Sequence, residues 1–333
     1  MKRRSLALHA IALGTTLWMG LTAGVAQAAV PLKTVTFIQE WPVADGFWIP
    51  WVMGTDKGFY AEEGIDLQIV APPTVADTMK FLGTGRADVA FTTVTDIVFA
   101  KEQGAPVIGI GRYGTGNNWG LFSQNGSPLK VSDLKGKTIG AYNDAWTTAQ
   151  LSMLLKSANL SVNDITVVTV ADDTVPLLLQ GRVDAITGIT NAEGTEIVTM
   201  GGKKPEFIAA VDHGVPDTPI LMFAGNQTWL QRNPELAKAF MRATQKSIHY
   251  AIKHPDEAVT AFGVKYSKAY DPVFIKQQWT DTLPILGQPD AKQLKFSAPA
   301  WNLLLKALTD QGVVKQPLPA AEYFTNDYIP AGN

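Results

Sequence analysis

The sequence predicts an α/β fold in two similar lobes, each built on a parallel sheet. Short β-rich segments alternate along the chain with segments whose apolar residues recur at helical spacing, a pattern typical of parallel α/β sheets. This order of elements occurs first near the start of the chain and again from about Trp119. A Gly-Arg-x-Asp-apolar stretch also occurs twice, as GRADV from Gly85 and as GRVDA from Gly181.

Length and composition indicate a globular protein and exclude several kinds of chemistry. The 333 residues suffice for two domains of ordinary size. With 46% hydrophobic and 17% charged residues, the chain is typical of folded proteins. It contains no cysteine, which excludes disulfides, thiolate nucleophiles and cysteine-ligated metals. We expect neither a cofactor nor a metal site.

Residues 1–28 are predicted to form a signal peptide that is removed on export. Basic residues at positions 2–4 precede an apolar stretch, and Ala26-Gln27-Ala28 has the small-x-small pattern that signal peptidase cleaves. A membrane anchor is the alternative, but the apolar stretch contains threonine, histidine and glycine before this cleavage pattern. No cysteine follows it for a lipid anchor. We expect a soluble periplasmic protein.

Export would leave a mildly acidic chain. Loss of three of the 28 basic residues leaves 25 against 30 acidic ones, a net charge of −5. A surface without basic runs argues against binding to nucleic acid or to an anionic membrane. We expect a monomer that binds no nucleic acid.

The first lobe is predicted to comprise residues 29–115 and to be completed by residues 220–333. Pro42 ends the first strand, because proline cannot donate to the ladder. Glycines at 58 and 85 close the first two helices. The expected strands are residues 33–39, 65–70, 88–91 and 107–113, and the expected helices are residues 49–60, 74–82 and 95–103.

The second lobe is predicted over residues 116–219 and repeats the same order of elements. A polar turn at residues 130–137 precedes its first expected strand, and Gly201-Gly202 ends its last helix. The expected strands are residues 138–142, 165–170, 185–189 and 207–211, and the expected helices are residues 147–158, 175–179 and 197–202.

The remaining residues are predicted to return to the first lobe through a strand at 220–225 and then to be mainly helical. Asn233 is a plausible cap for a long helix that has Pro234 at its first position. The expected helices are residues 234–253, 255–264, 271–283 and 298–311.

The two Gly-Arg-x-Asp stretches are interpreted as turns that lead from a helix into a buried strand. Glycine tolerates the left-handed helix cap, and each aspartate can accept hydrogen bonds from nearby backbone N–H groups. Ligands bind at the carboxyl ends of strands in open parallel sheets. The residues after each strand are therefore candidate ligand contacts: Thr92, Thr93 and Thr95 in the first lobe, and Gly188, Thr190, Asn191 and Glu193 in the second.

At these motifs the chain resembles a periplasmic solute-binding protein of an ABC importer, from the group of taurine/sulfonate, nitrate and thiamine-pyrimidine (NMT1/THI5-like) binders. The resemblance covers about residues 33–253. It rests on the segment GFYAEEGIDL from Gly58, the turns at Gly85 and Gly181, and the segment DLKGKTIG from Asp133.

The resemblance implies the type II fold of periplasmic binding proteins, with two α/β lobes, two crossover segments and a ligand cleft between the lobes. We place the crossovers near residues 112–119 and 218–223. The first contains glycines at 114 and 116, which suit a segment whose backbone angles change on closure. Binding would close the lobes, and a membrane permease would recognise the closed form.

Trp41 is expected to stack on a flat ligand. The segment Glu40-Trp41-Pro42 ends the first strand and resembles the acidic-Trp-x-Pro of thiamine-pyrimidine binders. Stacking is worth roughly 0.5–1.5 kcal/mol beyond area burial. The alternative is a core tryptophan. The family's usual Asn and His after the proline are absent, and residues 43–47 read VADGF instead.

Glu193 is the second expected ligand contact. Pyrimidine binders resemble this chain in having a carboxylate at the corresponding place. A carboxylate accepts hydrogen bonds from an aminopyrimidine or pairs with a cationic amine. The alternative is that Glu193 caps the helix that follows.

An organic anion is the alternative ligand, since Arg112 at a strand end and helix N-termini can bind anions. A hinge or surface salt bridge is the alternative for Arg112. The remaining candidate contacts are Tyr113 near the first crossover, and Asn143, Trp146 and Thr147 after the first strand of the second lobe.

The candidate cleft is rich in aromatics and carboxylates and poor in positive charge. We therefore expect a flat, neutral or weakly cationic nitrogen heterocycle that resembles a thiamine-precursor pyrimidine. The other ligand class considered is a sulfonate such as taurine, nitrate or an aromatic acid. Eukaryotic pyrimidine synthases share the fold but carry a cysteine-rich motif that this chain lacks. We expect a binding protein, not an enzyme.

Overall fold

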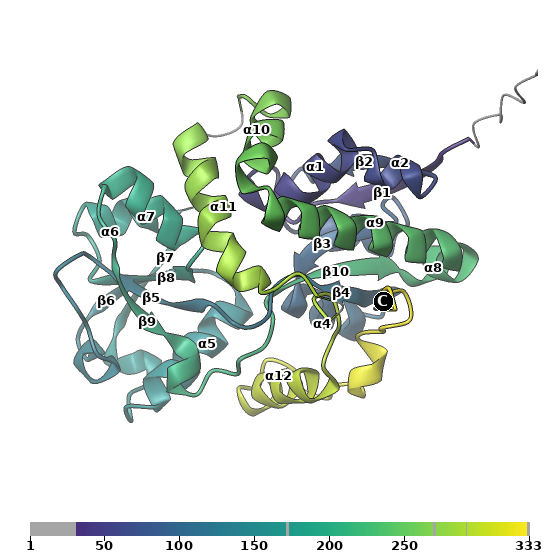
Figure 1. The fold of residues 1–333 in the computed structure, drawn as a ribbon. Coiled ribbons are helices and arrows are strands. Elements are labelled where there is room, and N and C mark those ends of the chain that lie inside the picture. The colour runs from purple at the N-terminus through teal and green to yellow at the C-terminus, as the bar shows by residue number, and fades with distance from the viewer. Residues whose placement is uncertain (1–30, 171–172, 269–270, 291, 332–333) are drawn as a thin grey trace, which may run out of the picture. The chain divides into compact units, whose positions relative to one another are not determined.

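The computed structural model describes residues 31–170, 173–268, 271–290 and 292–331. The predicted signal peptide lies outside the described residues. The chain from Leu32 to Asn333 forms one compact unit, which contains two five-stranded sheets flanked by helices (Figure 1). This arrangement confirms the predicted α/β fold.

The first sheet has the strand order β2-β1-β3-β10-β4. β1 pairs in parallel with β2 and β3, but β10 runs antiparallel to both of its neighbours, β3 and β4. The expectation of a parallel sheet is therefore wrong for β10. A parallel neighbour needs a crossover connection, usually a helix, from the adjacent strand, whereas the chain reaches β10 from β9 of the second sheet. The strands are β1 (Lys33–Ile38), β2 (Ile65–Val70), β3 (Val89–Thr93), β4 (Val107–Arg112) and β10 (Leu221–Asn226).

The second sheet has the order β7-β6-β8-β5-β9 and is also mixed. β5 was not expected as a strand, and it runs antiparallel to β8 and β9. Its sequence, WGLFS, is short and has no β-branched residue, so its extended state depends on pairing along both edges. The strands are β5 (Trp119–Ser123), β6 (Thr138–Tyr142), β7 (Thr166–Val170), β8 (Ala185–Ile189) and β9 (Glu206–Ala209).

The helices follow the predicted segments, with two differences. The expected helix over residues 49–60 is two helices, because Gly58 adopts the left-handed conformation (φ 74°) between them. The short α8 was not predicted. The α-helices are α1 (Ile49–Asp56), α2 (Phe59–Glu62), α3 (Asp77–Gly83), α4 (Val94–Glu102), α5 (Ala145–Lys156), α6 (Val175–Leu179), α7 (Glu193–Gly201), α8 (Gln227–Arg232), α9 (Pro234–Lys253), α10 (Pro255–Lys265), α11 (Pro272–Leu286) and α12 (Ala298–Asp310). The 3-10 helices are η1 (Gly46–Trp48), η2 (Val131–Leu134), η3 (Val162–Asp164), η4 (Ala210–His213) and η5 (Ala320–Glu322).

The two Gly-Arg-x-Asp stretches form the same turn in both sheets, as predicted. Gly85 and Gly181 have φ of 72° and 67°. Asp88 Oδ2 accepts the N–H of Thr36 at 2.9 Å, and Asp184 Oδ2 accepts the N–H of Thr138 at 2.8 Å. Each aspartate thus ties the entrance of one strand to the neighbouring strand.

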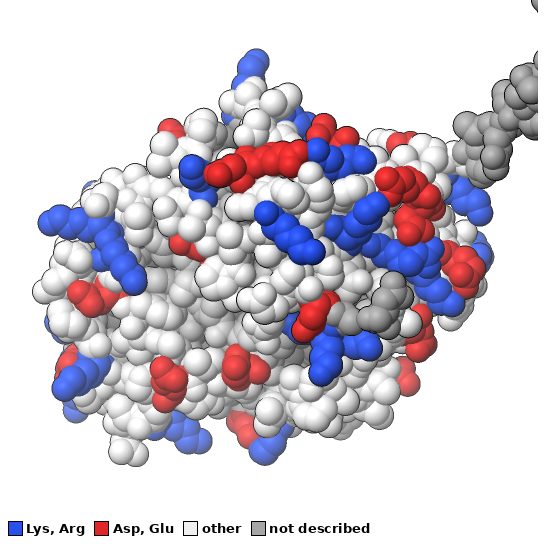
Figure 2. Space-filling model, in the orientation of Figure 1, with Lys and Arg blue, Asp and Glu red and all other residues white. Residues whose placement is uncertain are grey.

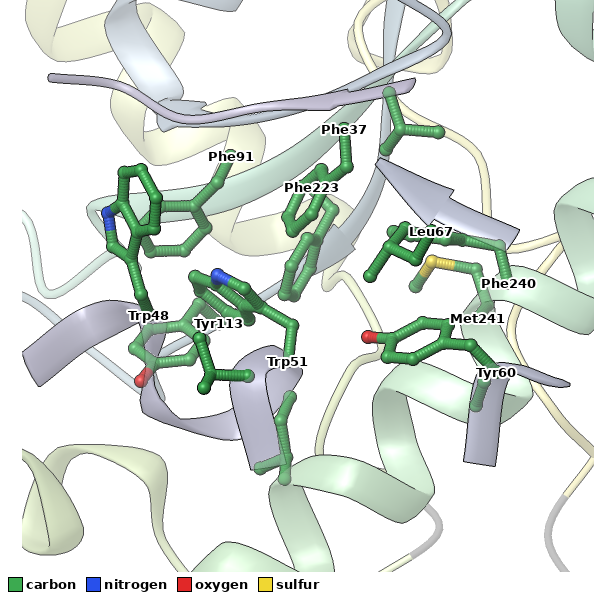
Figure 3. Close-up of a cluster of buried hydrophobic side chains, with 14 of the residues drawn as sticks. Phe37, Trp48, Trp51, Tyr60, Leu67, Phe91, Tyr113, Phe223, Phe240 and Met241 are labelled. Atoms are coloured by element: carbon green, nitrogen blue, oxygen red, sulfur yellow. The ribbon is translucent and has the colours of Figure 1, made fainter. Parts of the chain in front are cut away.

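An aromatic cluster forms the core of the first sheet's inner face. Trp51 meets Phe37 edge-to-face with a centroid distance of 5.3 Å, and Phe91 lies 5.0 Å from Trp51. Figure 3 shows these rings between the sheet and the helices that carry Trp51 and Phe240. The cluster fixes α1 and α9 on this face of the sheet.

Ion pairs join the helices that cover this core. Glu63 pairs with Arg242 at 2.7 Å, Glu62 with Lys246, and Lys57 with Glu257. Figure 2 shows that the acidic and basic side chains of the drawn face are interspersed. No helix in the described part of the chain is long and apolar enough to cross a bilayer.

Helix α11 lies between the two sheets (Figure 1). It packs against α10 and η1 on the side of the first sheet and against α7 on the side of the second. The sequence predicted the helix but not this position. α11 therefore contributes to any site between the sheets.

Candidate ligand site between the two lobes

A small cavity lies between the two sheets, beside the first connection between them. Its volume is about 10 Å³, roughly the room that one water molecule needs. A ring-shaped ligand therefore enters only if the lobes separate or α11 shifts. The cavity is lined by Phe47, Tyr113, Gly114, Gly116, Asn118, Asn191, Ile220, Leu221 and Ile285.

Tyr113 joins this cavity to the aromatic core. Its ring lies 5.0 Å from Phe91 and 6.3 Å from Phe47, both in edge-to-face geometry. The side chain is buried, and its hydroxyl has no hydrogen-bond partner among the described residues. Such a group is costly to bury unless something bonds it, so the Tyr113 hydroxyl is a candidate ligand contact.

Trp41 lies at the edge of the same aromatic group. It is half-buried and packs edge-to-face on Phe47 at 5.1 Å and on Phe91 at 5.9 Å. Trp41 does not line the cavity itself. Trp41 contacts Phe47, which does line the cavity, so stacking of Trp41 on a ligand requires a wider opening.

Asn191 is the polar centre of the cavity. Its Oδ1 accepts a hydrogen bond from Asn118 Nδ2 at 2.8 Å, and its Nδ2 donates to Thr282 Oγ1 at 2.9 Å. The first partner belongs to the crossover and the second to α11. The buried amide of Asn191 thereby links the end of β8 to both elements.

Three further hydrogen bonds hold α11 in place. On the second-lobe side, Thr195 Oγ1 donates to Asp281 Oδ2 at 2.7 Å. On the first-lobe side, Gln278 accepts the N–H of Gly46 at 2.7 Å and donates to Asp45 Oδ2 at 3.1 Å. Helix α11 therefore bridges the two lobes across the candidate site.

Asp45 is a buried carboxyl beside this bridge. Burial raises its pKa to about 7, although hydrogen bonds from Gln278, the N–H of Phe47 and Trp41 oppose the rise. Part of the Asp45 population is therefore protonated at neutral pH, and the carboxyl can then donate as well as accept a hydrogen bond.

Glu193 begins α7 and folds back over the end of β8. Its Oε2 accepts the N–H of Ile189 at 2.8 Å, and the carboxylate also accepts from the Glu193 N–H at the start of α7. Burial raises the pKa of Glu193, while the Ile189 N–H and Tyr142 lower it. Glu193 is two residues after Asn191 in the sequence but does not line the cavity.

Thr92 and Thr93, at the end of β3, contact a further buried carboxyl, Glu40, and Thr95 follows in α4. Thr93 caps α4 by accepting the N–H of Asp96 at 3.2 Å, and its hydroxyl lies 3.2 Å from that of Thr95. The hydroxyl of the fully buried Thr92 contacts Met79 Sδ at 3.5 Å. Burial raises the pKa of Glu40 well above its usual range, and Asp96 raises it further. Glu40 Oε2 has no partner among the described residues.

The three candidates after β6 lie outside the cavity lining. Asn143 is exposed. Trp146 is buried in the core of the second lobe, with an unpartnered indole N–H. Thr147 is buried, and its N–H donates to Asp144 Oδ1 at 2.7 Å as part of the α5 cap. The structure does not bring these residues together with Tyr113 and Asn191.

Arg112 lines a different cavity from Tyr113. Its guanidinium donates to the carbonyls of Gly114 at 2.7 Å, Lys295 at 2.7 Å and Lys292 at 3.1 Å. It forms no ion pair with any described carboxylate. Arg112 is thus neither at the interlobe cavity nor in the salt bridge considered as its alternative.

Several residues of the site were not predicted. Phe47 and Asn118 adjoin predicted segments, and the glycines and asparagines of the first crossover are the signal that could have identified Asn118. Gln278, Asp281 and Thr282 carry no such signal, because nothing local in α11 indicates that it lies between the lobes.

Sequence comparison finds similarity to proteins whose names refer to pyrimidines. It is 23% identical over 301 residues to the formylaminopyrimidine-binding protein of Halalkalibacterium halodurans, covering 89% of this chain and 90% of that protein. It is also 23% identical to the 4-amino-5-hydroxymethyl-2-methylpyrimidine phosphate synthase of Aspergillus parasiticus, covering 77% and 72% of the two chains.

Structure comparison gives the fold. The periplasmic aliphatic sulphonate binding protein SsuA from Escherichia coli matches with a TM-score of 0.68 at 13% identity, covering 90% of this chain and 92% of that one. The two-lobed type II fold of periplasmic binding proteins is therefore confirmed. The model of the family described as "NMT1/THI5 like" matches residues 48–258. The chain belongs to the NMT1/THI5-like family.

Proposed function

We propose that this chain is the extracytoplasmic solute-binding component of an ABC importer and captures a small flat nitrogen heterocycle, of the thiamine-precursor pyrimidine kind, by lobe closure. The observation that carries this proposal is the interlobe cavity, whose walls combine aromatic rings with amide groups and contain no lysine or arginine among the described residues. The similarity to a formylaminopyrimidine-binding protein supports the same ligand class.

The chemistry of the surrounding groups favours N–H donors on the ligand. The Asn191 amide and the Tyr113 hydroxyl can accept from an aminopyrimidine, as can the carboxyls of Asp45 and Glu193 once the lobes open. An aromatic wall suits a flat ring. A small anion would meet no lysine or arginine in the lining, and the carboxyls of Asp45 and Glu193 would repel it once the lobes open.

In this proposal the first lobe comprises residues 29–115 and 220–333 and the second comprises residues 116–219. The two close about the crossovers, and an inner-membrane permease takes the ligand from the closed form. We propose that the protein acts in the periplasm as a soluble monomer after removal of residues 1–28.

The test is calorimetric titration of the mature protein with formylaminopyrimidine, 4-amino-5-hydroxymethyl-2-methylpyrimidine, taurine, nitrate and benzoate. We expect the pyrimidines to bind and mass spectrometry to recover them intact. Binding of taurine, nitrate or benzoate alone would favour the organic-anion alternative in the same transport role. Conversion of the pyrimidine would mean an enzyme, the activity named for the fungal relatives.

Two variants test the residues. Trp41→Ala and Glu193→Ala are each expected to weaken pyrimidine binding by about tenfold, or 1.4 kcal/mol, with cooperative unfolding retained. Trp229→Ala is the matched control, because Trp229 is also half-buried but lies on α8, away from the cavity. Unchanged affinity in either variant removes that residue from the site.

A further inference from the structure

A second, larger cavity lies on the other face of the first sheet. Its volume is about 480 Å³, within the usual size range of small-molecule sites. Met222 pairs with Arg112 across β10 and β4, and both line this cavity. Their chain neighbours Leu221 and Tyr113 line the interlobe cavity instead. Because adjacent residues of an extended chain point to opposite faces, the sheet separates the two cavities.

The larger cavity contacts both connections between the lobes. Thr115 comes from the first connection and Thr218 and Pro219 from the second. The remaining walls come from the segment 292–297 and from α12. A ligand here would therefore touch the segments about which the lobes move.

The cavity walls carry an excess of positive charge. Arg112, Lys292 and Lys295 line it, against a single acid, Asp217. No described carboxylate forms an ion pair with these three cations. Asp217 Oδ1 already accepts the N–H of Asn117 at 2.8 Å. Burial lowers the pKa of Arg112, and the negative charge of Asp290, which lies outside the lining, opposes this shift. The Oδ1 of Asp290 accepts the N–H of Lys292 at 2.7 Å.

The guanidinium of Arg112 is held in one orientation by backbone carbonyls. Three backbone carbonyls fix its guanidinium at 2.7–3.1 Å, and these use three of its five N–H donors. Carbonyl contacts orient the group but leave its charge unneutralised. A pre-oriented guanidinium binds a carboxylate or sulfonate at little entropic cost.

The opposite wall supplies an apolar surface and one further donor. Trp301 is 3% exposed and lines the cavity, and its indole N–H has no partner among the described residues. Its ring packs on Phe296 at 5.8 Å. Ala300, Trp301 and Leu304 lie along one face of α12, whose N-terminus, capped by Ser297, is in the lining. A helix N-terminus favours negative charge.

We propose that this hinge-side cavity is a second binding site, which takes a small organic anion with a flat apolar body, such as an aryl carboxylate. The carboxylate lies against Arg112, Lys292 and Lys295, and the aryl group lies against Phe296, Trp301 and Leu304. The site stands independently of the function proposed for the interlobe cavity.

The test compares 2-naphthoate with its neutral isostere 2-naphthamide by calorimetry on the mature protein. We expect one naphthoate to bind per chain, about tenfold or more tightly than the amide, because only the acid uses the cationic wall. Equal affinity of acid and amide would overturn the proposal.

Variants locate the site. Lys292→Ala/Lys295→Ala removes two exposed ammonium groups but leaves the carbonyls that hold Arg112, and we expect at least a fivefold loss of naphthoate affinity, of the order seen for truncated charge partners. The matched control is Lys203→Ala/Lys204→Ala, an exposed pair on the second lobe, which should bind as wild type. An equal loss in both double variants would overturn the proposal.

A third variant fills the cavity. Ala300→Trp places an indole in the lining and should abolish naphthoate binding while leaving pyrimidine binding to the interlobe site intact. Wild-type naphthoate affinity in a folded Ala300→Trp protein would overturn the proposal, and the lysine variants decide the matter if that protein does not fold. If naphthoate behaves as expected and no pyrimidine binds, only the function proposed for the interlobe cavity falls.

Discussion

Several buried polar side chains of the two lobes have no partner or have shifted pKa values. The Tyr113 hydroxyl and Glu40 Oε2 are unpartnered among the described residues, and burial raises the pKa values of Glu40, Asp45 and Glu193. Buried groups of this kind destabilise a fold unless a ligand or function requires them. Of these groups, Tyr113 lines the interlobe cavity and Asp45 bonds Gln278 of the bridging helix α11, so these two support a binding role for that cavity.

Replacing Tyr113 with phenylalanine separates binding from stability. Because the Tyr113 hydroxyl is buried without a partner, Tyr113→Phe should keep or raise the free energy of unfolding, by up to about 1 kcal/mol. Pyrimidine affinity should fall in the same variant. Tyr60→Phe is the control, since the Tyr60 hydroxyl lies 3.2 Å from Thr244 Oγ1, and it should lose about 0.5–1.5 kcal/mol. Equal losses of stability in the two variants would show that Tyr113 is bonded in solution.

Asp45 makes stability depend on pH in a defined direction. Its pKa is raised from 3.8 to about 7 on folding, so between these values the folded state holds a proton that the unfolded state has lost. Stability is therefore fully present below the unfolded pKa and decreases as pH rises towards 7, with a slope of up to about 1.4 kcal/mol per pH unit.

The measurement is urea unfolding of wild type and Asp45→Asn between pH 4 and 8. Glu40 and Glu193 shift in the same direction, so the difference between the two proteins isolates Asp45. We expect the variant to have a flatter pH profile over this interval. Parallel profiles would mean that the Asp45 carboxyl titrates normally in the folded state.

At the scale of elements, glycine positions set where helices end. Gly85 and Gly181 occupy equivalent turns with positive φ, and each precedes a strand whose carboxyl end leads towards the region between the lobes. Gly58 does the same between α1 and α2. These backbone requirements are local, which is why sequence alone located the ends of most helices.

Alanine substitutions at two glycines should have opposite effects. Gly85→Ala should destabilise the fold by about 1–2 kcal/mol, because an L-residue is strained at φ 72°. Gly263→Ala should stabilise it by about 0.5–1 kcal/mol, since Gly263 lies inside α10 and an added Cβ meets nothing within 4 Å. Thermal and urea unfolding measure both. A destabilising Gly263→Ala would contradict the helical environment described for it.

At the scale of the whole molecule, α11 connects the lobes. Asn191 and Thr195 of the second lobe bond Thr282 and Asp281 of α11, and Gln278 anchors the same helix to the first lobe. The interlobe cavity has room for about one water molecule. Opening for a ligand must therefore break the hydrogen bonds on one side of α11.

Thr282→Val should shift the molecule towards an open state. The substitution keeps the shape of the side chain but removes the acceptor of the Asn191 amide, 2.9 Å away, which leaves a buried donor unpaired in the closed form. Small-angle scattering should report a larger radius of gyration without ligand. Thr280→Val is the control. Thr280 is exposed, and like Thr282 its hydroxyl donates to the carbonyl four residues earlier, but in the described part of the chain it has no bond to Asn191. Identical scattering from both variants would show that this bond does not hold the lobes.

Local patterns in the sequence were sufficient for the order of elements, the two Gly-Arg-x-Asp turns and the type of fold. Alternation of apolar residues and the placement of glycine and proline act over a few residues, so they can be recognised without neighbours. Asn191 was identified because it follows a predicted strand, and Tyr113 because it ends one beside the first crossover.

The remaining features depend on contacts between distant segments. The reversed directions of β5 and β10, the position of α11 between the lobes and the partition of Arg112 and Tyr113 between two cavities all follow from pairing across the chain. No local propensity encodes which neighbour a strand finds or which face a side chain then meets. Tertiary packing alone therefore decided that Arg112, expected at the interlobe site, lines the hinge-side cavity instead.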